Sequence, residues 1–184
     1  LGDRFKRDGY NTPKPLINIL GEPMIFHVIN GLYLNDDDTI IIIYNKELNN
    51  YNFESLITKN YDKCILIEMI LQTEGSVQTI LYGLDNLNKD LLTNKCVIID
   101  CDVIYNIDIL SLVRGQLYNS VFCFVDEQQK PIYSYVKLDE TSTIIKNKIT
   151  DVKEKIKISN YANTGCYCFV NGIILKKYCE RIIE

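Results

Sequence analysis

Short apolar runs rich in β-branched residues alternate along this chain with longer segments whose apolar residues recur at helical spacing. The predicted strands are residues 39–44, 63–71, 96–100, 120–126 and 166–170. The predicted helices are residues 23–34, 52–60, 76–87, 108–117 and 172–183. Strands that are separated by single helices favour right-handed crossovers, and continuously apolar strands are typical of a sheet covered on both faces. The pattern therefore predicts an α/β fold with a largely parallel sheet.

This alternation breaks after residue 126. Residues 132–138, 143–147 and 150–154 have the character of strands, and no helical segment separates them. We therefore expect a small antiparallel subsheet beside the parallel core. No internal repeat or low-complexity linker divides the sequence, which predicts one domain over residues 1–184.

Composition and charge exclude several classes of protein. The chain has 20 Lys and Arg against 24 Asp and Glu, a formal net charge of −4, so we expect no nucleic-acid partner. Its apolar runs are far shorter than the ~20 residues of a membrane span, and its first residues do not resemble a signal peptide. Seven cysteines without metal-site spacing are typical of reduced thiols, so we expect a cytoplasmic protein with no membrane partner. The sequence is compatible with a homo-oligomer.

Residues 2–16 form a basic loop in an otherwise acidic chain. Four cations face two carboxylates there, namely Arg4, Lys6, Arg7 and Lys14 against Asp3 and Asp8. Gly2 would allow backbone N–H groups to approach phosphate oxygens, and the cations would neutralise phosphate charge. Prolines on both sides of Lys14 stiffen the backbone that carries it. The alternative is a solvated surface loop.

Two carboxylates, Asp100 and Asp102, follow an apolar predicted strand. Open α/β sheets bind ligands outside the carboxyl ends of their strands. The two like charges call for a cation, and Mg²⁺ suits them because it takes oxygen ligands and shares its shell with substrate phosphates. The alternative is a turn that ends the strand and caps a helix.

Two further loops carry polar groups. Lys155, beside Glu154 in a lysine-rich stretch, could hold a phosphate as a point charge, and the segment Asn163-Thr164-Gly165 offers hydrogen-bonding side chains beside a glycine. The loop with Gln72, Glu74 and Gly75 joins a predicted strand to a predicted helix, so it faces the same edge as Asp100 and Asp102. The alternatives are surface lysines with a turn, and an ordinary loop whose Ser76 caps the next helix.

Together and in this order, these segments resemble the sugar-phosphate nucleotidyltransferases, also called nucleoside-diphosphate-sugar pyrophosphorylases, in particular small single-domain members of surface-polysaccharide pathways. The segments that carry the resemblance are Gly2-Asp3-Arg4-Phe5, Pro13-Lys14-Pro15-Leu16, Thr73-Glu74-Gly75, Asp100-Cys101-Asp102, Glu154-Lys155 and Asn163-Thr164-Gly165. The resemblance implies a Rossmann-like three-layer sandwich of the GT-A type. It also implies an enzyme that joins a sugar-1-phosphate to a nucleoside triphosphate with release of pyrophosphate.

The resemblance also implies roles for individual residues. Arg4, Lys14, Asp102 and Lys155 form the catalytic set, with Asp102 as the ligand of Mg²⁺ and Lys155 on the acceptor phosphate. The residues near the nucleotide are Gly2, Asp3, Arg4, Lys14, Gln72, Glu74, Gly75 and Asp100. The residues near the acceptor are Glu154, Lys155, Asn163, Thr164 and Gly165.

The sequence departs from the family pattern in two ways, and alternative functions remain open. Members of the family usually place a hydrophobic strand before the loop and a metal-binding Asp after the Asn-Thr-Gly segment, so we expect residues 1–184 to be truncated at both ends. A cytidylyltransferase for a phosphorylated alcohol such as phosphocholine fits the same residues. A non-catalytic nucleotide-sugar-binding module and a glycosyltransferase remain, although a glycosyltransferase needs no triphosphate-binding basic loop.

Overall fold

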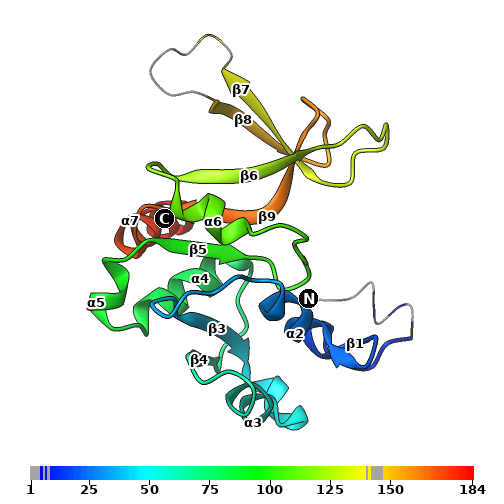
Figure 1. Ribbon diagram of the computed structural model, residues 1–184, viewed down its shortest axis with the longest axis vertical. Coiled ribbons are helices and arrows are strands. Elements are labelled where there is room, and N and C mark those ends of the chain that lie inside the picture. The colour runs from blue at the N-terminus through cyan, green and yellow to red at the C-terminus, as the bar shows by residue number, and fades with distance from the viewer. Residues whose placement is uncertain (1–4, 6, 8, 140, 142–146) are drawn as a thin grey trace.

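A computed structural model describes residues 5, 7, 9–139, 141 and 147–184 (Figure 1). Its first described elements are short: the 3-10 helix η1 (Lys14–Leu16) and the hairpin of β1 (Asn18–Ile19) and β2 (Glu22–Pro23). Helix α2 (Met24–Asn30) follows and ends earlier than its apolar pattern predicts. Gly2, Asp3, Arg4 and most of the predicted strand at 143–147 lie outside the described residues.

Two parallel strands form the part of the fold shown at the bottom of Figure 1. Strand β3 (Ile40–Asn45) pairs in parallel with β4 (Cys64–Met69), and the 3-10 helix η2 (Lys46–Tyr51) and helix α3 (Phe53–Thr58) connect them. Side chains of β3 alternate between two layers, as the pleat of a strand requires. Ile42 and Tyr44 pack with α2 and α3, whereas Ile43 contacts Gly83 of α4 (Ser76–Asp85) on the opposite face.

The larger sheet has five strands: β5 (Cys96–Ile99), β6 (Ser120–Val125), β7 (Ser134–Asp139), β8 (Lys148–Glu154) and β9 (Tyr161–Phe169). All of its pairings are antiparallel. Ala162 pairs with both β6 and β7, and Cys168 pairs with both β5 and β6. Strand β6 therefore runs along one side of β9, and β5 and β7 share the other side.

The α/β fold is confirmed. The described strands, however, pair mostly in antiparallel fashion and not in the mostly parallel sheet that we expected. The only parallel pair among them is β3 with β4. Strands β5 and β6 do run in the same direction, as a crossover through α6 (Ile109–Arg114) requires, yet β9 enters between them and opposes both. The predicted antiparallel pairing after residue 126 is confirmed for β7 and β8, but both strands belong to the five-stranded sheet through the pairing of β7 with β9 and form no separate subsheet.

Helices cover both faces of β5. Val97 and Ile99 pack toward α6 in one apolar cluster. Cys96 and Ile98 pack toward α4, α5 (Lys89–Leu92) and α7 (Gly172–Ile183) in another. This gives the three layers expected from continuously apolar strands. None of the helices in the described part of the chain has the length and apolar character needed to span a membrane.

Candidate active site

The end of strand β5 presents the first two candidate residues. The strand stops at Ile99, and the exposed residues Asp100 and Asp102 follow in a turn. The backbone N–H of Asp100 donates to the carbonyl of Gly165 at 3.0 Å, and the N–H of Val103 donates back to the carbonyl of Asp100 at 3.3 Å. These bonds fix the turn against β9, so both carboxylates stand at the rim of the sheet.

The basic loop reaches this rim through Lys14. Pro13 has the extended backbone angles φ −55° and ψ 142°, and Lys14 then starts η1, which is closed by an N–H···O bond from Leu16 to Pro13 at 2.8 Å. The Lys14 ammonium forms an ion pair with the Asp102 carboxylate. It also lies 6.0 Å from the centre of the Phe5 ring, within the range of a cation–π contact. The structure thus joins two predicted site residues that are 88 positions apart.

The Asn163-Thr164-Gly165 segment packs beside Asp100. Gly165 has a φ of +79°, and a Cβ atom at this position would lie 2.7 Å from Asp100 Oδ2. Glycine is therefore needed here twice, for its backbone angle and for the space the carboxylate occupies. Asn163 Oδ1 accepts from the Gly165 N–H at 2.8 Å, which holds this conformation. The carboxylate of Asp100 and the backbone of Gly165 form one unit.

Side chains of this segment are already engaged within the protein. Thr164 Oγ1 donates to the carbonyl of Phe122 at 2.9 Å, and Asn163 Nδ2 donates to the Tyr167 hydroxyl at 2.8 Å. The Tyr105 hydroxyl donates to the Thr164 carbonyl at 3.1 Å. The sequence motifs extend to Tyr167 but assign no role to it, and they do not include Tyr105. The bonds of the two tyrosines stiffen the backbone around Gly165.

The electrostatics of the rim follow from its like charges. Although residue Asp100 as a whole is exposed, its carboxyl packs against Gly165, and this partial desolvation raises the pKa of the carboxyl above its ordinary value. The neighbouring carboxylate of Asp102 raises it further. The Lys14 ammonium opposes this rise. A cation therefore stabilises the charged form of Asp100, whether it is an ammonium group or a metal ion.

The two carboxylates of the rim suit a magnesium ion only if other ligands complete its coordination shell. Within the described residues, no group of three or more His, Cys, Asp and Glu side chains lies close enough to hold a metal. Asp100 and Asp102 offer hard carboxylate oxygens, and Mg²⁺ is commonly held by one or two carboxylates with water and substrate phosphates. These two residues could hold Mg²⁺ in that manner.

Glu154 and Lys155 form no hydrogen bond or ion pair with the described residues of the rim. They lie where β8 ends, and their side chains pair with each other at 3.0 Å while 71% and 67% exposed. Lys155 has a φ of +54°, and its N–H donates to the carbonyl of Tyr133 at 2.8 Å. Its backbone is fixed, but its ammonium extends into solvent at the end of the β7–β8 ribbon.

The loop from β4 to α4 carries the remaining candidates. Gln72, Glu74 and Gly75 lie in this loop, and the backbone N–H of Glu74 donates to Oε1 of Gln78 in α4 at 2.8 Å. Gly75 precedes α4 with an extended backbone, and its carbonyl accepts from the Thr79 N–H at 3.2 Å. The expected helix cap by Ser76 is not present, because Gly75 takes the N-cap position.

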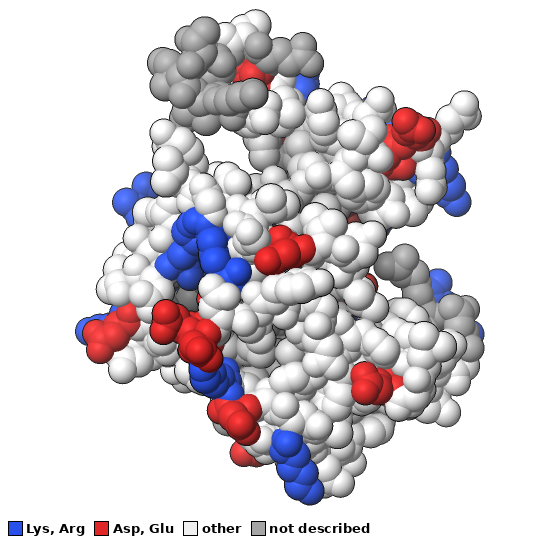
Figure 2. Space-filling model, in the orientation of Figure 1, with Lys and Arg blue, Asp and Glu red and all other residues white. Residues whose placement is uncertain are grey.

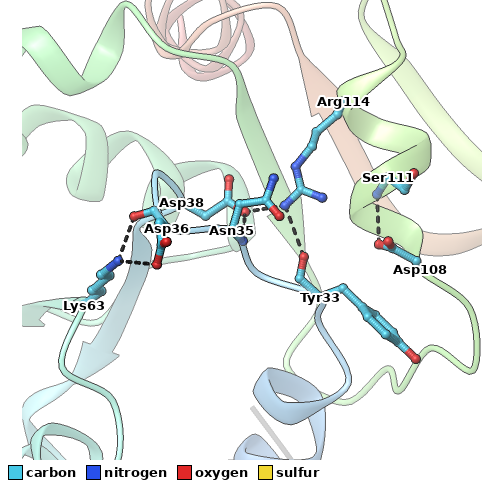
Figure 3. Close-up of polar contacts among 8 residues, drawn as sticks. All are labelled: Tyr33, Asn35, Asp36, Asp38, Lys63, Asp108, Ser111 and Arg114. Atoms are coloured by element: carbon cyan, nitrogen blue, oxygen red, sulfur yellow. Dashed lines mark hydrogen bonds and ion pairs between the residues drawn. The ribbon is translucent and has the colours of Figure 1, made fainter.

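A second polar cluster holds the loop before β3 and is separate from the candidate site (Figure 3). Arg114 pairs with the Asp38 carboxylate and donates to the carbonyl of Tyr33 at 3.1 Å. Lys63 pairs with Asp36 at 3.3 Å, both being largely exposed. The cluster holds loop 33–38 against α6 and against Lys63, which immediately precedes β4, so these contacts stabilise the fold. Figure 2 shows that acidic and basic side chains on this face of the molecule lie in small groups close to one another.

Comparisons with known proteins agree with the motifs. A sequence model of the nucleotidyl transferase family matches residues 2–182. The bifunctional protein GlmU of Campylobacter curvus is 27% identical over 184 residues, which is 95% of this chain and 38% of that protein. GlmU of Methanococcus aeolicus is 28% identical over 167 residues, covering 89% of this chain and 36% of that protein. The chain thus spans little more than a third of the length of these curated relatives.

Solved structures share the fold. A nucleoside-diphosphate-sugar pyrophosphorylase from Vibrio cholerae has a TM-score of 0.73 at 18% identity, over 100% of this chain and 76% of that one. The inositol-1-phosphate CTP transferase from T. maritima has a TM-score of 0.72 at 14% identity, over 97% of this chain and 68% of that one. The resemblance seen in the loop and strand-end motifs is confirmed, and the chain belongs to the nucleotidyl transferase family.

Proposed function

We propose that this chain carries the active site of a magnesium-dependent nucleotidyltransferase that joins a sugar-1-phosphate to a nucleoside triphosphate. A phosphate oxygen of the acceptor attacks the α-phosphorus. The bond from the α-phosphorus to the bridging oxygen breaks, and pyrophosphate leaves with the electron pair. The observation that carries the proposal is the meeting of Lys14 with Asp102 at the rim of the sheet, beside Gly165.

In this reaction the protein mainly positions the two substrates and neutralises their negative charge. Lys14 and Arg4 would neutralise the triphosphate, whose base would lie over the loop with Gln72, Glu74 and Gly75. Asp102, with Asp100 beside it, would hold Mg²⁺, which supplies positive charge to the phosphate oxygens. None of these residues needs to act as a covalent nucleophile.

The acceptor would lie along β9 toward the β7–β8 ribbon. Lys155 would take its phosphate, while Glu154 and the Asn163-Thr164-Gly165 backbone would border its sugar or polyol. Because the Asn163 and Thr164 side chains already bond within the protein, backbone groups are the better candidates for acceptor contacts here. A cytoplasmic place in polysaccharide biosynthesis would suit this reaction.

A second acceptor class is a phosphorylated alcohol, with CTP as the nucleotide. The structural neighbour from T. maritima is by its name a transferase for inositol-1-phosphate and CTP, and it shares this fold over nearly the whole chain. The two classes place the same phosphate on the same α-phosphorus. They differ in the base of the triphosphate and in the acceptor group that Glu154 and Gly165 would border.

A screen of five common nucleoside triphosphates against sugar-1-phosphates, inositol phosphate and phosphocholine tests the proposal. Pyrophosphate release is the readout, with Mg²⁺ or with a chelator. We expect release only when a triphosphate, an acceptor and the metal are all present. Release that needs no acceptor, sugar transfer from a finished nucleotide sugar, or binding without turnover would reject the proposal. The last two outcomes would indicate a glycosyltransferase and a non-catalytic binding module.

A further inference from the structure

The ion pair between Lys14 and Asp102 bears on how a metal can reach the site. The Lys14 ammonium contacts Oδ2 of Asp102, the side chain that carries the metal in the proposed function. An ammonium and a divalent ion cannot share that oxygen closely, because both are cations and both need its lone pairs. Binding of the ion to Oδ2 therefore requires Lys14 to move away.

Both partners of the pair are held by their backbones. Lys14 stands at the start of η1 between two prolines, and the Phe5 ring lies 6.0 Å from its ammonium. Asp102 belongs to the turn that hydrogen bonds attach to Gly165 of β9. The side chains are only 25% and 39% exposed, so the pair is less screened than an ordinary surface contact. This favours a persistent pair over a fluctuating one.

The charges around the rim decide what can replace the pair. If a divalent ion alone takes Asp102, the displaced ammonium is left beside two positive charges and without its carboxylate. If the ion arrives on a triphosphate, the phosphate oxygens give the ammonium a new anionic partner. Asp100 and Asp102 are too few ligands to hold the ion by themselves, since no larger donor cluster exists among the described residues.

We propose that Lys14 competes with the divalent ion for Asp102, so that the site admits the metal as a metal–triphosphate complex and discriminates against the free ion. The inference rests on the proposed function, because that function assigns the metal to Asp102. Lys14 thereby acts as a positioning residue for the metal in addition to its contact with phosphate. The consequence is an order of binding in which metal and nucleotide enter together.

Binding of Mn²⁺ to the full chain, without nucleotide, tests this competition. Mn²⁺ replaces Mg²⁺ as the probe because its electron paramagnetic resonance signal reports the free ion. We expect Lys14→Met to bind Mn²⁺ about tenfold more tightly than the unmodified protein, as the loss of one nearby positive charge predicts. Lys14→Arg keeps the charge and should bind as weakly as the unmodified protein.

Two controls separate competition from a general change of charge. Lys63→Met removes the same charge from an exposed pair with Asp36, so it should leave Mn²⁺ affinity unchanged. Adding Asp102→Asn to Lys14→Met should remove the gain, because the oxygen in question is gone. If Lys14→Met fails to fold by circular dichroism, Lys14→Gln gives the same comparison with a neutral polar side chain.

The outcomes distinguish this inference from the proposed function. Equal Mn²⁺ affinity in Lys14→Met and the unmodified protein, or an equal gain in Lys63→Met, overturns the competition even if pyrophosphate release is observed. A gain that depends on Asp102 supports the competition. If the substrate screen then shows no turnover, the proposed function fails on that separate result.

Discussion

Two regions carry the candidate chemistry, and they differ in how far the fold has already organised them. At the rim, Lys14 pairs with Asp102 and the backbone of Gly165 fits against Asp100. At the end of the β7–β8 ribbon, Glu154 and Lys155 pair only with each other and are largely exposed. The rim is preorganised by residues distant in sequence, whereas the ribbon end has its backbone fixed and its charges in solvent.

This difference has a physical consequence for each substrate. A preorganised charge costs little reorganisation during reaction, so the rim suits the stabilisation of the reacting phosphates. A solvated lysine must give up water and side-chain freedom when it binds, so the ribbon end suits recognition of an acceptor. We therefore expect substitutions at the rim to affect turnover and substitutions at the ribbon end to affect affinity.

The largest expected effect is at the rim. Lys14→Ala and Asp102→Ala should each lower kcat roughly 100-fold or more, the scale for loss of a preorganised charge. The double variant should lose less than the product of the two, because both residues act on the same phosphates. Steady-state pyrophosphate release measures all three. Lys63→Ala is the matched control, and near-normal kcat in either single variant would show that the rim is not the reacting site.

The next largest effect should be a loss of stability in Gly165→Ala. The new Cβ would lie 2.7 Å from Asp100 Oδ2, and the φ of +79° is unfavourable for alanine, so we expect a loss of about 2 kcal/mol. Gly21→Ala is the control, because Gly21 has a φ of +100° and no heavy atom near its added Cβ. Urea unfolding of both variants isolates the contact with Asp100. Equal losses would mean that the rim tolerates the methyl group.

At the ribbon end, Lys155→Ala should raise the KM for the acceptor about tenfold and leave the KM for the triphosphate unchanged. Lys153→Ala removes the same charge two residues earlier, within β8, where its ammonium is 3.9 Å from Asp151. It should have little effect, because the prediction assigns the acceptor phosphate to Lys155 alone. A change confined to the triphosphate KM would place Lys155 on the nucleotide instead.

How much the sequence could predict also differs between the two regions. Periodicity gave α7 with its observed limits and gave the β7–β8 hairpin, because these depend on local spacing and burial. The strand-end rule placed Asp100 and Asp102 at the rim, whereas the expectation that Lys14 joins Asp102 in one site came from the resemblance to the nucleotidyltransferases. The entry of β9 between β5 and β6 could not be predicted, since both neighbours are apolar strands and nothing local selects the partner.

The short elements were missed for a similar reason. Helix α5 spans only Lys89–Leu92, and η1 begins between two prolines that suggest an irregular loop. Neither is long enough to show a period. At the site, the sequence could not predict that the side chain of Lys155 extends into solvent. Its backbone has a positive φ, and lysine is not a residue type that marks such a conformation.

The smallest expected effect concerns the thiol between the two carboxylates of the rim. Cys101 is exposed, whereas Cys166 is buried and burial raises its pKa to about 12. Burial also raises the pKa of Cys96 to about 11. The pKa of the Cys101 thiol is raised by partial desolvation and by the carboxylates on either side of it, against the opposing Lys14 ammonium. Cys101 should thus be the fastest thiol with iodoacetamide, and its rate should rise with pH because only the thiolate reacts.

A nucleotide bound at the rim would cover Cys101. Saturating Mg²⁺–triphosphate should therefore slow its alkylation about threefold, which peptide mass spectrometry can follow at each cysteine. Acceptor phosphate alone should protect less, since Glu154 and Lys155 at the ribbon end pair with each other and not with the described residues of the rim. Cys101→Ser should remove the fast phase. Equal protection by either substrate would contradict the division of labour between the two regions, because both ligands would then cover the same strand end.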